Sequence, residues 1–127
     1  MKNVKFWKEA VDAGFDPGAY PYATEKIPMG SVEAVLDAKI WAKQQMGIGC
    51  YFTRVGTGER FLLTVYRDRK DSRYRIKDCP IDFAVCPVGA GYLYRLEVEL
   101  NGKGNAVLRG ARLLGGTSSV VVENAVG

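Results

Sequence analysis

The pattern of apolar and polar residues predicts a short helix near the start of the chain. Val4, Trp7 and Val11 recur at helical spacing, and the residues between them are mostly charged. Gly14 follows, and a glycine in a left-handed conformation commonly ends a helix. From residue 15 to residue 28, three prolines keep the residues that precede them out of the helical region, so this stretch is expected to wrap the core as an extended connection.

A second, longer helix is expected over residues 31–46. Ser31 suits the N-cap of a helix, and Gly47 is placed to end it. Asp37 and Lys39 fall outside the apolar stripe of this helix, so we expect them in solvent. The stripe itself, at 3.6-residue spacing, consists of Val32, Val35, Leu36, Ile40 and Trp41.

After Gly47 the pattern changes to period two, which is typical of strands. Four segments are rich in β-branched and aromatic residues, and glycine-containing turns at 56–59 and 101–104 join them in pairs, as in hairpins. The four predicted strands are residues 48–55, 60–67, 92–100 and 105–113.

Two further short strands are expected at 73–78 and 81–86, at the edge of the sheet because Pro80 and Pro87 cannot donate to a ladder. The sequence therefore predicts an α+β fold: an antiparallel sheet of five or six strands with one or two N-terminal helices packed on one face. The 127 residues, 47% of them hydrophobic, suffice for one core. We expect a single domain over 1–127, divided into an N-terminal helix and wrapping segment (1–30), a main helix (31–46), the sheet (48–113) and a weakly ordered tail or edge strand (114–127).

Composition favours a soluble, cytoplasmic protein. The sequence has no apolar run of the roughly 18 residues that a membrane-spanning helix needs, and no pattern of an export signal at its start. Its three cysteines, Cys50, Cys79 and Cys86, are an odd number, which is atypical of a disulfide framework. We interpret them as small apolar residues of strands.

The absence of histidine excludes imidazole-dependent triads and histidine-ligated metal sites. Carboxylates holding a divalent metal remain conceivable, with Asp82, Glu97 and Glu99 as candidates, but Glu97 and Glu99 also fit a solvated strand face. Three pairs of glycines, in residues 56–58, 89–91 and 102–104, lie between predicted strands, where we expect turns rather than phosphate loops. We therefore expect neither an enzyme nor a bound metal or cofactor.

A basic, aromatic stretch is the strongest functional signal. Residues 67–77 carry six cationic and two acidic side chains, an excess of four that equals the net charge of +4 of the whole chain. Cations that track phosphates, with rings on which bases stack, are typical of proteins that hold single-stranded nucleic acid or RNA. The candidate binding residues are Tyr51, Arg54, Arg60, Tyr66, Arg67, Arg69, Lys70, Arg73, Tyr74, Arg75 and Lys77.

Two other functions stay open. Arginine and tyrosine displayed on a sheet also suit a protein interface. Such a protein could be a small inhibitor that docks on an acidic surface, for example an anti-defence protein of a phage or mobile element. A pocket for a small anionic nucleotide is the third alternative. Arg109 and Arg112 lie three residues apart on a predicted strand, so they point to opposite faces unless a bulge intervenes.

Overall fold

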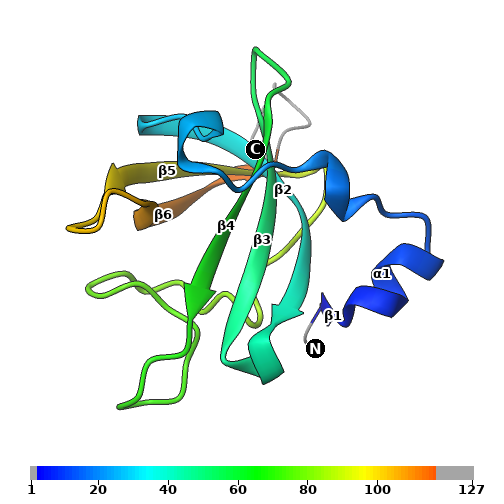
Figure 1. The fold of residues 1–127 in the computed structure, drawn as a ribbon, viewed down its shortest axis with the longest axis horizontal. Helices are drawn as coiled ribbons and strands as arrows, with labels where there is room; N and C mark the ends of the chain where they lie inside the picture. Colours follow the sequence, from blue (N-terminus) through cyan, green and yellow to red (C-terminus); the bar gives the residue numbers. More distant parts are fainter. Residues whose placement is uncertain (1–2, 117–127) are drawn as a thin grey trace.

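The computed structural model of the protein describes residues 3–116, most of which belong to or connect the strands of one sheet (Figure 1). One helix, α1 (Trp7–Asp12), precedes the sheet's long strands, and the α+β class with an antiparallel sheet is confirmed. The 3-10 turns are η1 (Pro17–Ala19), η2 (Thr24–Lys26) and η3 (Lys43–Gln45). The strands are β1 (Val4–Lys5), β2 (Gly30–Ala42), β3 (Gly47–Arg54), β4 (Arg60–Tyr66), β5 (Tyr92–Leu100) and β6 (Ala106–Gly116).

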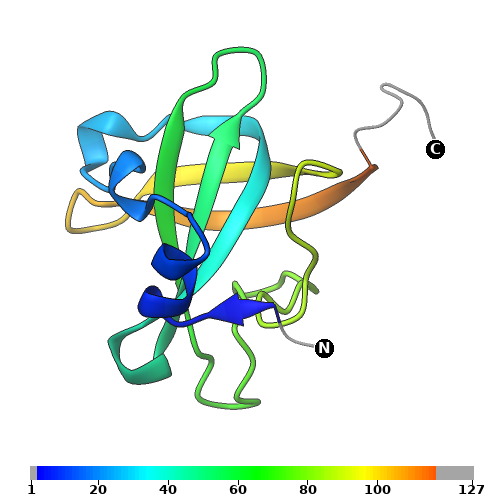
Figure 2. The same ribbon diagram turned by 90° about the vertical axis from the view of Figure 1, so that its right-hand side faces the viewer.

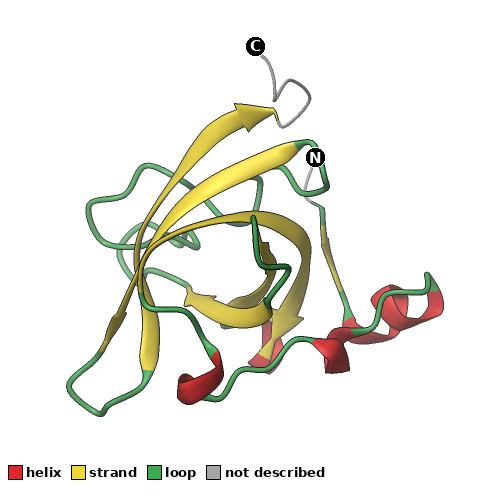
Figure 3. Ribbon diagram, turned by 90° about the horizontal axis from the view of Figure 1, so that it is seen from above, coloured by secondary structure: helices red, strands yellow, loops and turns green. Residues whose placement is uncertain are grey.

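The strands are ordered β4-β3-β2-β5-β6, and every neighbouring pair along this path is antiparallel. β2, β3 and β4 follow one another as a meander, and β5 returns through residues 67–91 to lie beside β2, which is a Greek key. Seen from above, the sheet curls so that its edge strands β4 and β6 approach each other (Figure 3). The result is a partly open barrel of five strands, with β1 added in parallel beside the end of β2.

The predicted main helix over 31–46 is wrong, because this segment forms strand β2. Val32, Ala34 and Leu36 alternate into the core as strand residues should. A β-bulge directly after Leu36 then shifts the phase by one residue, so that Lys39 points into the core and Ile40 to the opposite, covered face. Burial on both faces and the phase shift together produce apolar spacing that imitates a helix.

The N-terminal helix is confirmed but shorter than predicted, and it is the one α-helix among residues 3–116. Val4 belongs to β1, which pairs with β2 at Lys39 and Ile40. α1 buries Ala10, whereas Trp7 and Val11 of the predicted apolar stripe are exposed. The expected packing of one or two helices on one face is therefore realised only in part, by this short helix.

The predicted short strands at 73–78 and 81–86 are also wrong. Within 67–91 the structure has one isolated bridge, between Arg67 and Tyr74, and otherwise turns. Ser72 and Asp78 have left-handed backbones, which interrupt an extended chain. The predicted tail or edge strand at 114–127 lies outside the described residues, except that β6 runs to Gly116.

The core fills the inside of the curled sheet. We expected the second helix to cross the sheet over a buried set of six residues: Trp41, Leu36, Phe61, Leu63, Leu96 and Val98. The last five are buried together, Trp41 is partly buried and packs against them, and they lie beneath a curved sheet and not beneath a helix. A second, smaller cluster lies on the outer face of β2 and β3, where the N-terminal segment covers them. This cluster consists of Ala10, Tyr20, Ile40 and Tyr51.

Candidate nucleic-acid interface

Ten of the eleven predicted binding residues fall into two groups at the ends of β4, and the other, Tyr51, lies within β3. Arg54 and Arg60 flank the turn between β3 and β4, whereas residues 66–77 follow the other end of β4. Figure 2 shows this turn at one extreme of the molecule and the loop after β4 at the other. Six residue steps of a strand at about 3.3 Å each place Arg60 about 20 Å from Tyr66. The predicted single cluster is therefore two separate clusters.

The loop of residues 67–77, called here the basic loop, carries most of the charge. Its side chains at 67, 69, 70, 73 and 77 are exposed, and within residues 3–116 none of them pairs with an acidic side chain. These five unpaired cations are Arg67, Arg69, Lys70, Arg73 and Lys77.

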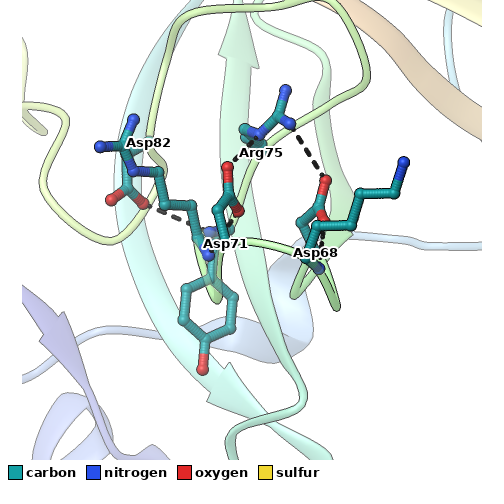
Figure 4. A network of polar contacts seen from close by, with 7 residues as sticks. Asp68, Asp71, Arg75 and Asp82 are labelled. Carbon is teal, nitrogen blue, oxygen red and sulfur yellow. Dashed lines mark hydrogen bonds and ion pairs between the residues drawn. The ribbon is translucent and has the colours of Figure 1, made fainter.

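Arg75 differs from these five because two carboxylates hold it (Figure 4). Its Nε donates to Asp71 Oδ2 at 2.8 Å, and its Nη2 lies 3.3 Å from Asp68 Oδ2. The Asp71 carboxyl also accepts the backbone N–H of Arg73, which is the first cause that holds the pKa of this carboxyl below its ordinary value. Arg75 therefore organises the loop, and the unpaired cations around it remain available to a ligand.

Acidic residues in and beside the loop also bind backbone groups. Asp68 accepts the N–H of Lys70 at 2.7 Å, and Asp82 accepts the N–H groups of Tyr74 and Ala84. Such side-chain to backbone bonds fix turns without neutralising the exposed ends of lysine and arginine. The positive excess is therefore presented to solvent on a defined backbone.

The three predicted tyrosines have different environments. Tyr66, at the end of β4 and next to the basic loop, is 55% exposed. Tyr74 is buried, with its ring edge-on to Trp41 at 5.3 Å and its hydroxyl donating to the carbonyl of Gln45. Tyr51 is buried in the outer cluster against Tyr20. Tyr66 alone among the three presents a free ring face.

Arg54 and Arg60, at the other end of β4, are partly engaged. Arg54 Nη1 lies 3.0 Å from Glu59 Oε1. The guanidinium carbon of Arg60 lies 5.6 Å from the centre of the Tyr20 ring, a cation–π contact. The Tyr20 hydroxyl donates to Asp37. Burial of Tyr20, and after it this hydrogen bond, raises the pKa of Tyr20 to about 12.

Lys39 lies in a different environment from the one predicted from the sequence. We expected it in solvent, but it is 1% exposed, and its Nζ donates to the carbonyls of Phe83 at 2.7 Å and Cys86 at 2.6 Å. Burial lowers the pKa of this amine. Its position between apolar residues, Ala38 and Ile40, was the signal in the sequence. Because Lys39 is enclosed, we assign it to holding residues 83–86 on the sheet and not to ligand binding.

The carboxylates considered as metal ligands have other partners. Glu97 accepts the Ser31 hydroxyl, Glu99 lies 3.7 Å from Arg109, and Asp82 binds the backbone as described. Among residues 3–116, no group of three or more carboxylates and cysteines has the spacing of a metal site. The three cysteines are buried and free, and a bulge in the pairing of β5 with β6 at Arg109 brings it and Arg112 to exposed positions.

No helix within the described part of the chain is long and apolar enough to cross a membrane. Comparison of the chain with protein-family models, with curated proteins and with solved structures finds no match in any of the three. The geometry of the basic loop is therefore the basis for assigning a function.

Proposed function

We propose that the protein binds single-stranded nucleic acid through the basic loop and Tyr66, without catalysis. The observation that carries this proposal is the set of five cations on one organised loop with no acidic partner in the described structure. The phosphates of a nucleic-acid strand supply the negative charge that these five cations lack, and arginine forms bidentate contacts with phosphate. The exposed ring of Tyr66 beside these cations suits stacking on a base.

The strand arrangement supports the same function by analogy. A partly open Greek-key barrel of five strands is the architecture of the OB-fold, whose second and third strands bind oligonucleotides. In this protein the second and third strands of the barrel are β3 and β4, and Tyr66 ends β4. A fold does not specify a function. The analogy therefore adds only that the proposed ligand lies against the strands that carry ligands in that architecture.

The salt dependence of binding tests the proposal. Each phosphate contact to a single strand contributes about 0.7 to the slope of log affinity against log salt. The double variant Arg69→Gln/Arg73→Gln removes two unpaired cations and is expected to lower this slope by about 1.4. A control, Lys5→Gln/Lys8→Gln, removes two charges near α1, where Lys8 is paired with Asp12, and should leave the slope unchanged.

Replacing Tyr66 separates stacking from charge. Tyr66→Ala is expected to cost about 1–3 kcal/mol of binding energy per stacked base without changing the salt slope. If the unaltered protein shows no association with single-stranded DNA or RNA at about 50 mM salt, where phosphate contacts are strong, the proposal is wrong. The unpaired cations would then point to an acidic protein surface as the partner.

A further inference from the structure

A groove lies at the opposite end of β4 from the basic loop. The groove has a volume of about 470 Å³ and is open to solvent. Three segments meet there: the N-terminal connection, η2 and the turn between β3 and β4. The lining residues are Ala19, Pro21, Lys26, Gly58, Glu59 and Arg60. We call it the hairpin groove.

The hairpin groove is positively charged. Lys26 is exposed, and within residues 3–116 its amine pairs with no carboxylate. The carboxylate of Glu59 already accepts from Arg54 and from the Thr57 hydroxyl, so it does not neutralise Lys26 or Arg60. The groove therefore presents the cations Lys26 and Arg60 to a ligand, whereas Glu59, the acidic residue of its lining, is already bonded to Arg54 and Thr57.

Structure on both sides holds the groove in shape. The carbonyl of Pro21 accepts the backbone N–H of Leu62 at 2.9 Å, which fastens the N-terminal connection to β4. The guanidinium of Arg60 lies over the Tyr20 ring, a contact that favours one position of this side chain. Tyr22, which follows the groove residue Pro21 in the chain, is 78% exposed. Cations thus occur at both ends of β4, and an exposed tyrosine is adjacent in sequence to each group, Tyr66 to Arg67 and Tyr22 to Pro21 of the groove.

The spacing of the two cationic regions fits one strand of nucleic acid. Arg60 and Tyr66 lie on the same, outward side of β4, because side chains alternate along a strand. A stacked strand advances about 3.4 Å per nucleotide, so the distance of about 20 Å along β4 corresponds to about six nucleotides. This length lies within the range of about 4–16 nucleotides that barrels of this kind occupy.

We propose that the hairpin groove is a second phosphate-binding subsite, and that one nucleic-acid strand extends from the basic loop along β4 to Lys26 and Arg60. This inference rests on the proposed function and adds a site size of about six nucleotides to it. Oligonucleotides shorter than this reach the basic loop alone, whereas longer ones engage both subsites.

The test measures the affinity and salt slope of oligo(dT) of about three, six, nine and twelve nucleotides. Lys26→Gln is the central variant because this exposed, unpaired side chain can be changed without disturbing the fold. For the longest oligonucleotide, its salt slope should be lower by about 0.7 than that of the unaltered protein, and for the shortest it should be the same. Lys5→Gln, which removes one exposed lysine elsewhere, is the matched control and should change neither slope.

Arg60→Gln provides a second, independent variant with the same expected dependence on length, provided that its melting temperature shows that it folds. Each comparison between variants is made at one length, so the greater number of binding registers on a longer strand cancels. If the protein binds but Lys26→Gln and Arg60→Gln affect all lengths equally, or affect none, the hairpin groove is not a subsite. If the unaltered protein binds no length, the proposed function itself fails.

Discussion

Replacing Lys39 by methionine tests how a buried amine contributes to the fold. Methionine keeps a long, flexible side chain but removes the donor to the carbonyls of Phe83 and Cys86. A buried polar group without its partner costs about 1–3 kcal/mol, so leaving two carbonyls unpaired destabilises the folded protein by about 2–6 kcal/mol. Methionine also avoids the cost of burying an ammonium group, and this gain offsets part of the loss. Lys39→Met is therefore expected to lower the free energy of unfolding, most strongly at high pH.

The pH dependence follows from the direction of the pKa shift. Burial lowers the pKa of Lys39 in the folded state below its value in the unfolded chain. Between these two pKa values the unfolded chain holds a proton that the folded protein lacks, so stability rises with pH, by up to about 1.4 kcal/mol per unit. Below the folded pKa the amine is charged in both states and the penalty of burying it is fully present.

The assay is chemical denaturation of both proteins between about pH 6 and pH 10, and the quantity compared is their difference in unfolding free energy. Ionisable groups that do not interact with residue 39 contribute equally to both proteins and cancel in this difference. Cys86, whose Sγ lies 3.8 Å from Nζ, does not cancel, so the comparison is repeated with Cys86→Ala in both proteins. The other ionisable neighbours of Lys39 are Cys50 and Asp82, and both are present in the two proteins that are compared. Lys5→Met, an exposed lysine on the adjacent β1, is the control.

A difference that grows with pH toward the pKa of unfolded lysine, about 10.4, is the expected result. A difference that stays constant over this range, or a Lys39→Met protein that is more stable than the unaltered one at every pH, would refute the reasoning. The control should differ from the unaltered protein by less than about 0.5 kcal/mol and show no pH trend.

Three further results are expected. Leu96→Ala should cost about 2–5 kcal/mol in denaturation experiments because Leu96 is fully buried in the barrel, and a melting temperature that barely changes would contradict this core. The three cysteines should react slowly with alkylating reagents in the native protein, since all are buried and burial raises the thiol pKa of Cys50 and Cys86; rapid modification of the folded protein would argue against this. Gln45→Gly should raise stability by about 0.5–1 kcal/mol, because Gln45 has a left-handed backbone with φ of 68°, and a loss of stability would show that its side chain matters.

The hairpins could be predicted from the sequence because their signals are local. Glycine-rich turns and period-two alternation depend on neighbouring residues, and β3, β4, β5 and β6 occur close to where these signals placed them. β2 could not be predicted, because its bulge and its burial on both faces arise from tertiary pairing with two other strands. This tertiary pairing outweighs the helix propensity of residues such as Ala34 and Leu36.

The candidate site could also be predicted only in part, because some of its properties are local in sequence and others depend on tertiary contacts. The charge excess of the basic loop is a property of consecutive residues and could be read directly. Which cations are free could not, since the pairing of Arg75 with Asp68 and Asp71 depends on the turn geometry. The burial of Tyr74 depends on Trp41, far away in sequence. Lys26 was missed because a lone lysine between prolines carries no pattern.

The hydrogen bond from Leu62 to the Pro21 carbonyl also bears on how copies of this protein behave toward one another. β4 is an edge strand of an open barrel, and such edges are templates on which another chain can add a strand. By occupying an N–H group of this edge and laying proline-containing chain beside it, the N-terminal connection blocks that addition. A protein shortened by its first 29 residues would expose the edge of β4, and self-association into sheets or aggregates is the expected consequence.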